Sequence, residues 1–247
     1  MKPILRARGI GKVYGTRGSS FAALDGVDLD VDAGEFTGIM GPSGSGKTTL
    51  LNLLSAIDRP TAGSILFEGR DLETMTGAEL AAFRRDRLGF VFQDFNLIDT
   101  LTVRENIVLP LALAGRPAAA QAAACDKRAG ELGIRDALDK YPTEISGGQK
   151  QRAAAARALV AEPALVLADE PTGNLDSASS EQLWTLLGEL ARERAITVLM
   201  VTHEPAAAAH CRRVFVLKDG QVTGTIESEG LDAGGVAARY QQCVGAA

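Results

Sequence analysis

The sequence predicts an α/β fold with a mostly parallel sheet, an N-terminal antiparallel β layer and an inserted α-helical subdomain. Short continuous apolar runs bounded by turn residues alternate with helix-like segments, which is the rhythm of parallel β-α-β units. Near-alternating apolar residues close to the start indicate a half-buried antiparallel sheet. A long alanine-rich stretch in the middle has helix-capping patterns and no strand pattern.

The N-terminal part is expected to begin with two short strands at residues 4–14 and 21–31, separated by glycines and serines. A third short apolar run at 36–40 leads into the glycine-rich segment GPSGSGKT. The helix-like segment TTLLNLLSAI follows and stops before Pro60. The predicted order is therefore strand, glycine loop, helix.

The middle of the chain changes from mixed to helical composition. We expect a strand at 64–67, a charged amphipathic helix at 79–87 and an apolar strand at 88–92 that leads directly to Gln93. Nearly everything from 102 to 161 is predicted to be helical.

Two capping-box patterns mark helix starts in this region: Thr102 with Glu105, and Ser146 with Gln149. We therefore expect residues 93–160 to form the inserted helical subdomain.

The C-terminal part returns to strands. Apolar runs at 165–168 and 196–201 are separated by a predicted helix at 178–194, and a hairpin is expected through KDGQ between 214–217 and 222–226. The last twenty or so residues are expected to be a loosely attached helical tail. The predicted division is 1–92 with 161–226 as an α/β core, 93–160 as the helical subdomain and 227–247 as the tail.

Composition excludes several classes of protein. With 247 residues the chain can bury a core without disulfides, and its net charge of -5 disfavours a general nucleic-acid binder. The three cysteines, Cys125, Cys211 and Cys243, have neither disulfide-framework nor zinc-site spacing, which favours reduced thiols. Neither a signal-peptide core nor an apolar run of about 20 residues is found, so we expect no export and no membrane span.

A phosphate-binding loop is the first chemical motif. Its glycines allow successive backbone N–H groups to surround phosphate oxygens at a helix N-terminus. Lys47 would reach the β and γ phosphates of ATP, and Thr48 would bind Mg²⁺. The alternative is a plain glycine-rich turn, which the strand before and the helix after disfavour. The candidate residues are Gly41, Pro42, Ser43, Gly44, Ser45, Gly46, Lys47, Thr48 and Thr49.

Two adjacent carboxylates, Asp169 and Glu170, follow the predicted strand at 165–168. Ligands of open α/β sheets lie at this end of the strands. Asp169 would hold Mg²⁺, usually through water, and Glu170 would act as general base toward the attacking water. Alone, such a pair is more often a helix cap, but the upstream phosphate loop favours the catalytic interpretation.

The segment Ile145-Ser146-Gly147-Gly148-Gln149, at the head of a predicted helix, resembles the signature of the ABC ATPase family. The resemblance implies a P-loop NTPase (RecA-like) core. It also implies that Ser146, Gly147, Gly148 and Gln149 bind the γ phosphate held by the P-loop of an opposite subunit. Backbone amides and a helix dipole can form such a site without a lysine. Without the resemblance, SGGQ is a helix cap with flexible glycines.

Further family positions are matched in order along the chain. Gln93 resembles the Q-loop glutamine, which would touch Mg²⁺ or the water, and Asp176 of Asn174-Leu175-Asp176 resembles the D-loop aspartate that reaches across the dimer. His203 resembles the switch histidine at the γ phosphate. The alternatives are a surface glutamine, a turn and a structural histidine; His210 is interpreted as structural.

Tyr14 resembles the A-loop aromatic residue that stacks on adenine. The alternative is a tyrosine that packs within a strand. GNLD stands here where many relatives carry SALD, and we expect little effect from that difference.

The resemblance covers about residues 2–226. QDFNLIDTLTVREN, KYPTEISGGQKQR and VTHEP resemble the ATPases that pair with FtsX-like permeases, most closely the bacitracin-resistance type. This implies antimicrobial peptide resistance, a permease on a separate chain, a head-to-tail ATP-sandwich dimer and a position at the cytoplasmic face of the membrane. A sensor kinase could act through the permease.

Several other functions stay open. They are lipoprotein or macrolide export, a division-type regulatory ATPase that transports nothing, a non-transport ABC ATPase and a P-loop kinase for a small molecule.

Overall fold

The computed structural model describes residues 3–16 and 19–245. The ends of the predicted ranges, 1–2 and 246–247, and residues 17–18 between the first two predicted strands lie outside the described residues. Contacts divide the chain into two compact units. The first contains residues 1–80 with 184–247, and the second contains residues 81–183.

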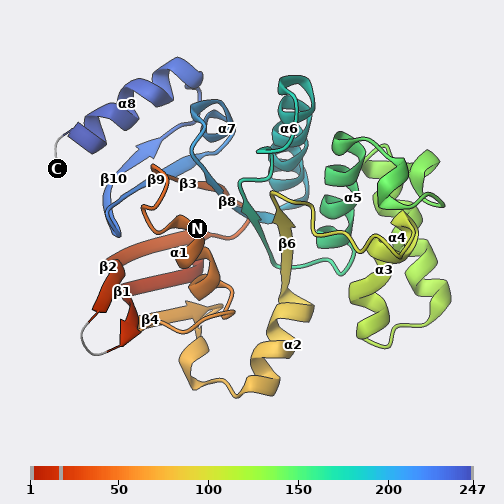
Figure 1. Cartoon of the computed structure of the whole chain (residues 1–247), viewed down its shortest axis with the longest axis horizontal. Coiled ribbons are helices and arrows are strands. Elements are labelled where there is room, and N and C mark those ends of the chain that lie inside the picture. The colour runs from red at the N-terminus through yellow and green to blue at the C-terminus, as the bar shows by residue number, and fades with distance from the viewer. Residues whose placement is uncertain (1–2, 17–18, 246–247) are drawn as a thin grey trace. The chain divides into compact units, whose positions relative to one another are not determined.

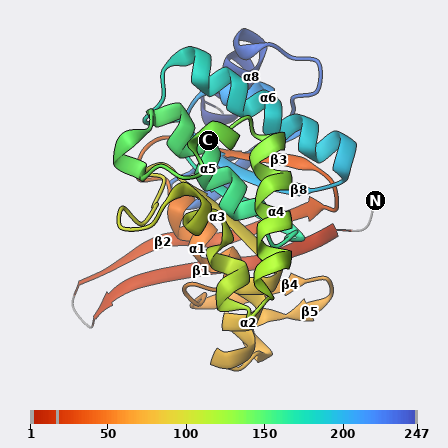
Figure 2. The same cartoon turned by 90° about the vertical axis from the view of Figure 1, so that its right-hand side faces the viewer.

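A four-stranded antiparallel sheet with the order β2-β1-β4-β5 lies in the first unit (Figure 1; β5 is labelled in Figure 2). Its buried side chains recur with the near-alternation of a sheet that has one covered face; they include Leu24, Val27, Leu29 and Val31. The antiparallel layer is therefore confirmed. The strands are β1 (Pro3–Thr16), β2 (Ser19–Asp32), β4 (Ala62–Phe67) and β5 (Arg70–Asp71).

β1 and β2 are longer than predicted, because the glycines and serines between them belong to the ladder. Gly15 pairs with Ser20, and Thr16 pairs with Ser19. A Cβ atom at Gly15 would lie only 2.1 Å from the Ser19 carbonyl oxygen, and Gly15 has φ 108°. Glycine is required there by close backbone approach.

The parallel strands of the first unit are largely buried. β3 (Phe36–Met40) pairs in parallel with β8 (Thr197–Thr202) and with β9 (Arg213–Lys218), which confirms the predicted parallel sheet. Every residue of β3 and β8 is buried. A strand covered on both faces reads as a continuous apolar run, which is why these strands could be found from the sequence.

The predicted C-terminal hairpin is formed by β9 and β10 (Gln221–Glu227). Its turn residues Asp219 and Gly220 have φ 48° and 78°, as a two-residue turn with positive φ at both positions requires.

The C-terminal tail is helical and contacts neighbouring elements of the first unit. α8 (Ala233–Gly245) packs against β10 and against α7 (Pro205–Ala209), with Val236 fully buried (Figure 1). The Lys218 ammonium donates to the Val244 carbonyl oxygen over 2.9 Å. The first unit also contains α1 (Lys47–Leu54) and a 3₁₀ turn at Leu72–Thr74.

The second unit combines a parallel strand pair with helices. β6 (Leu88–Phe92) pairs with β7 (Leu165–Asp169), and α3, α4 and α5 pack against one another (Figure 2). These helices confirm the predicted helical region. Their bounds are α3 (Val103–Leu113), α4 (Ala118–Glu131) and α5 (Gly147–Leu159), with 3₁₀ turns at Arg135–Ala137 and Pro142–Glu144. The unit boundaries fall inside α2 (Gly77–Arg87) and α6 (Ser177–Arg194).

Small residues let β6 approach α5 closely. A Cβ atom at Gly89 would lie 2.3 Å from the Ala158 carbonyl oxygen. The alanines of α5 between residues 153 and 158 are all buried. The alanine-rich composition of this helix is therefore explained by packing against a strand at short distance.

Candidate functional site

The glycine loop joins β3 to α1, as predicted, and it is shaped by close contacts. A Cβ atom at Gly41 would lie 2.1 Å from the Leu217 carbonyl oxygen, and one at Gly46 would lie 2.6 Å from the Ala23 carbonyl oxygen. Gly46 also caps α1 with φ 101° and offers no side chain to the first backbone N–H groups of the helix. Those N–H groups suit an anion such as phosphate.

The Lys47 side chain folds into this loop. Its ammonium donates to the carbonyl oxygens of Gly41 (2.9 Å) and Pro42 (3.0 Å), and only 6% of the residue is exposed. The neighbouring Ser45 hydroxyl is buried without a hydrogen-bond partner among the described residues. A buried cation beside an unpaired hydroxyl donor is suited to anionic oxygens.

His203 belongs to the same unit and lies at the same sheet edge as the loop. It follows β8, which runs parallel to β3, and its side chain is exposed. Because neighbouring parallel strands end at one edge, the first unit brings His203 and the glycine loop to the same end of the sheet.

Tyr14 lies on β1, near the first turn of α1. Its phenol donates to Asp58 over 2.9 Å and also interacts with the Thr49 hydroxyl. Burial, and then the Asp58 carboxylate, raise the pKa of the phenol above its ordinary value. The residue is 41% exposed, so a ligand can reach it.

In the second unit, Asp169 ends β7 opposite Phe92 of β6, so Gln93 follows at the same sheet edge. Glu170 comes next with φ 43°, a left-handed conformation that is uncommon for residues other than glycine. Strained backbone of this kind clusters at functional sites. The acidic pair and Gln93 are thus brought to one edge.

The turn after the acidic pair contacts the Gln93 segment. The Asn174 amide donates to the Gln93 carbonyl oxygen (3.1 Å) and to the Asp94 carboxylate (2.8 Å). A Cβ atom at Gly173 would lie 2.6 Å from the Gln93 side-chain nitrogen. The chain after β7 therefore fixes the Gln93 backbone and limits the space of its side chain.

Ser146 is the N-cap of α5, and the predicted capping box with Gln149 is present. The Gln149 N–H donates to the Ser146 hydroxyl (3.3 Å), and the Ser146 N–H donates to the Gln149 side-chain oxygen (3.0 Å). Ser146 and Gly147 are exposed. The head of α5 is therefore open to a partner molecule.

The head of α5 adjoins the segment that carries Asp176. A Cβ atom at Gly147 would lie 3.7 Å from the Asn174 carbonyl oxygen. Asp176 is exposed and accepts from the Ser179 N–H and hydroxyl, each over 2.9 Å. The Ser179 backbone N–H, and then its hydroxyl, lower the pKa of the Asp176 carboxyl.

The expected site residues thus form two groups, one in each unit. The first comprises Tyr14, the residues from Gly41 to Thr49 and His203; the second comprises Gln93, Ser146, Gly147, Gly148, Gln149, Asp169, Glu170 and Asp176.

The sequence analysis gave no role to Lys12 and Asp58, and it named Asn174 only as part of the D-loop segment and not as a partner of Gln93. Each acts through a contact that joins segments distant in the chain, and local pattern gives no signal for such contacts.

Thr48, Gln93 and Asp169, the residues expected to bind Mg²⁺, each carry a side-chain oxygen, which is the type of ligand that Mg²⁺ prefers. Nowhere in the described parts of the chain do three or more His, Cys, Asp or Glu side chains form a metal-binding cluster. The cysteines Cys125, Cys211 and Cys243 are free thiols. Within residues 3–16 and 19–245, no helix is both long and apolar enough to cross a bilayer.

Comparison with known proteins identifies the family. The model of the ABC transporter family matches residues 24–173. The chain is 52% identical over 219 residues to the bacitracin export ATP-binding protein BceA of Halalkalibacterium halodurans, which covers 89% of this chain and 87% of that protein. It is 41% identical over 222 residues to the macrolide export ATP-binding/permease protein MacB of Wolinella succinogenes, covering 90% of this chain and 34% of the relative.

Solved structures indicate the same family. The dimeric structure of MJ0796, a bacterial ABC transporter cassette, has a TM-score of 0.85 with 38% identity and covers 92% of this chain and 100% of its own. The same cassette in a post-hydrolysis state bound to ADP and Pi has a TM-score of 0.84 with 37% identity, with the same shares covered. The chain belongs to the ABC transporter family and is one of its ATP-hydrolysing cassettes.

Proposed function

We propose that this ATPase energises a separate FtsX-like permease in antimicrobial peptide resistance. The observation that carries the proposal is the 52% identity to a bacitracin export ATP-binding protein over nearly the full length of both chains. Because the shared region accounts for 87% of that relative, little of it is left over for a membrane domain. A permease on another polypeptide is therefore the natural partner.

The residues from Gly41 to Thr49 bind the phosphates of ATP in this proposal. The loop amides and the N-terminus of α1 surround the anion, and the Lys47 ammonium exchanges its loop carbonyls for phosphate oxygens. The partly exposed ring of Tyr14 stacks on the adenine.

Thr48, Gln93 and Asp169 would hold Mg²⁺, which would neutralise charge on the phosphate oxygens during hydrolysis. Asp169 ends β7 and pairs with Phe92 of β6, so the sheet fixes its backbone position.

Glu170 accepts the proton of the attacking water as general base. His203 contacts the γ phosphate, and Gln93 orients the water and reports the state of the nucleotide to residues 93–160, the proposed helical subdomain. Two strand pairings support these roles. β3 and β8 end together, next to the glycine loop and His203, and β6 and β7 end together, next to Gln93 and Glu170.

Two copies of the chain close head to tail over ATP. The head of α5, where Ser146 and Gly147 are exposed, binds the γ phosphate held by the other copy through Ser146, Gly147, Gly148 and Gln149. Asp176 reaches across the dimer. Hydrolysis removes the charge that joins the two copies, so the dimer reopens and moves the permease. The assembly lies at the cytoplasmic face of the membrane, and a sensor kinase can act through the permease.

Macrolide export is the second candidate, because MacB relatives match 90% of this chain at 41% identity. The chain spans about a third of that relative, whose name includes a permease. The two candidates differ in partner and in cargo.

The test combines the chain with its permease. Co-expression with an FtsX-like permease should give a complex whose ATPase activity is stimulated by bacitracin and whose loss sensitises cells to that peptide. Stimulation by macrolides and not by bacitracin would favour the second candidate. Ser146→Arg should keep ATP binding but abolish hydrolysis in the complex; unchanged hydrolysis would exclude the shared-site dimer.

A further inference from the structure

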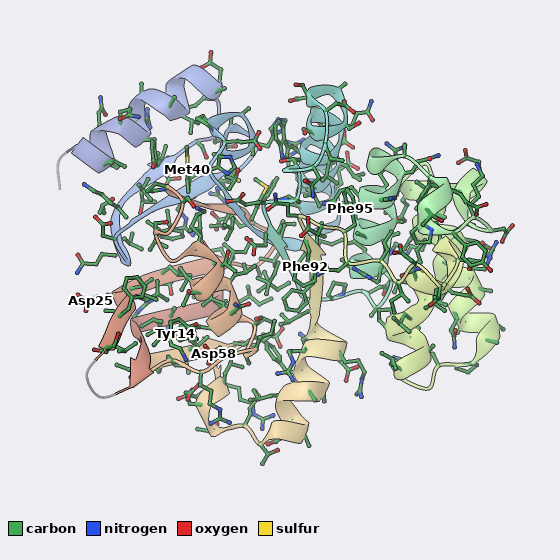
Figure 3. The ribbon with its side chains drawn as sticks, viewed as in Figure 1. Tyr14, Asp25, Met40, Asp58, Phe92 and Phe95 are labelled. Carbon is green, nitrogen blue, oxygen red and sulfur yellow. The ribbon has the colours of Figure 1, made fainter. Side chains whose placement is uncertain are left out.

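A connected set of charged and aromatic side chains surrounds Tyr14 in the first unit. Lys12 and Tyr14 lie two positions apart on β1, and Asp58 follows α1 in the chain. Figure 3 shows Tyr14 next to Asp58. Neither Lys12 nor Asp58 belongs to a nucleotide-binding motif identified above.

The contacts among these residues are short. One oxygen of the Asp58 carboxylate accepts from the Tyr14 phenol (2.9 Å), and the other accepts from the Lys12 ammonium (2.7 Å). The Lys12 ammonium also donates to the Arg59 carbonyl oxygen (2.7 Å) and lies 4.9 Å from the centre of the Tyr14 ring. The ring is therefore restrained both at its hydroxyl and at its π system.

Asp58 is itself fixed to the helix that starts at the phosphate loop. Its backbone N–H donates to the Asn52 carbonyl oxygen of α1 (3.2 Å), and its carboxylate accepts from the Arg59 N–H (2.7 Å). The Tyr14 phenol also interacts with Thr49 in the first turn of α1. Contacts with α1 thus restrain the orientation of the ring. The N-terminus of the same helix forms the proposed phosphate site.

Lys12 is the most buried of the three side chains. The Lys12 side chain is 12% exposed and that of Asp58 is 34% exposed, whereas Tyr14 is 41% exposed. The Lys12 ammonium, and then other hydrogen bonds, lower the pKa of the Asp58 carboxyl despite its partial burial. Asp58 is therefore charged at neutral pH and accepts from both partners, while the ring keeps an open surface.

We propose that Lys12 and Asp58 are positioning residues that hold the Tyr14 ring in the orientation for stacking on the base of the nucleotide. The inference rests on the proposed contact between Tyr14 and adenine. Restraining the ring before binding lowers the ordering cost at the moment of binding. Lys12 and Asp58 therefore increase the affinity for the base of the nucleotide. They do not affect phosphate binding or hydrolysis.

A purely structural role is the competing explanation, in which the Lys12–Asp58 pair only joins β1 to the segment after α1. A double-mutant cycle with Tyr14 separates the two explanations, because a positioning role acts only through the ring. Binding of inorganic tripolyphosphate, which has phosphates but no base, shows whether a substitution has damaged the phosphate loop and not only the position of the ring.

The experiment measures the ATP dissociation constant by calorimetry, and KM and kcat for hydrolysis, on the full chain. Lys12→Met and Asp58→Ala should each raise the dissociation constant and KM roughly three- to tenfold, with kcat unchanged. The inhibition constant of inorganic tripolyphosphate should not change. Glu79→Ala, which breaks the Arg70–Glu79 ion pair elsewhere in the unit, is the matched control and should leave ATP affinity unchanged.

The outcomes are distinct. In a Tyr14→Ala background, Lys12→Met and Asp58→Ala should have no further effect on ATP affinity. An equal effect in that background, or a parallel loss of tripolyphosphate binding, would overturn the positioning role. If Tyr14→Ala itself leaves ATP affinity unchanged, the base contact in the proposed function fails first. Should Asp58→Ala not fold, Asp58→Asn keeps the test, since it removes the charge that attracts Lys12.

Discussion

Met40, the last residue of β3, lies opposite Thr202, the last residue of the parallel strand β8. One residue further on, the chain continues as Gly41 of the phosphate loop on one strand and as His203 on the other. Strand register thus places the glycine loop, which we propose to bind phosphate, and the His203 side chain at one edge, although they are distant in the sequence.

The first prediction concerns His203. His203→Ala should lower ATP hydrolysis about 100-fold or more, because a positioned acid-base or hydrogen-bonding group is lost. Its side chain is exposed, so stability should change little, and ATP binding should be retained. His210→Ala is the control. The centroid of the His210 ring lies 5.6 Å from that of Trp184, so this substitution should lower the free energy of unfolding by about 1 kcal/mol and leave hydrolysis unchanged. Equal hydrolysis in both variants would contradict the assignment.

Glu170→Gln tests the general base. The variant should bind ATP normally, hydrolyse it about 100- to 10,000-fold more slowly and accumulate as an ATP-dependent dimer in light scattering. Glu162→Gln is the matched control, because Glu162 also has a positive φ (53°, against 43° for Glu170). Glu162 pairs with Lys127 and belongs to none of the nucleotide-binding motifs. Normal turnover in Glu170→Gln would remove the residue from its proposed role.

Much of the fold could be predicted because it depends on local pattern. The bounds of β3 and β6 agree with the sequence prediction to the residue, since buried parallel strands are continuous apolar runs. The capping boxes at Thr102 and Ser146 were found for the same reason: their partners lie three residues away.

Features that depend on contacts between distant segments were not predicted. Lys12 and Asp58 are 46 residues apart, and Asn174 and Gln93 are 81 apart. Nothing in their local sequence indicates that they meet. The contacts of α8 were not predicted for a similar reason, because they are made with the β9–β10 hairpin and with α7. The left-handed conformation of Glu170 also has no local signal.

The carboxyl of Glu79 should titrate far below its usual range. The Thr76 N–H (2.8 Å), and then Arg70 and the Thr76 hydroxyl, lower its pKa from 4.5 to about 2. A depressed folded-state pKa stabilises the fold above pH 4.5, and this contribution is lost as pH falls toward about 2. NMR titration of the side-chain carboxyl should give a midpoint near 2, and Glu79→Gln should flatten the stability change in that window. A midpoint near 4.5 would show that Glu79 does not keep its hydrogen bonds to Thr76 and Arg70 in solution.

Gly173→Ala should move Gln93 without unfolding the protein. The new Cβ atom would lie 2.6 Å from the Gln93 side-chain nitrogen and 2.8 Å from its side-chain carbonyl carbon, and this exposed side chain can move aside. Hydrolysis should fall about tenfold because the water-orienting amide is displaced, while stability changes by less than about 1 kcal/mol. Gly77→Ala, with no atom within 4 Å of its Cβ, is the control and should leave hydrolysis unchanged. If both variants hydrolyse ATP at the normal rate, the position of Gln93 observed here is not required for catalysis.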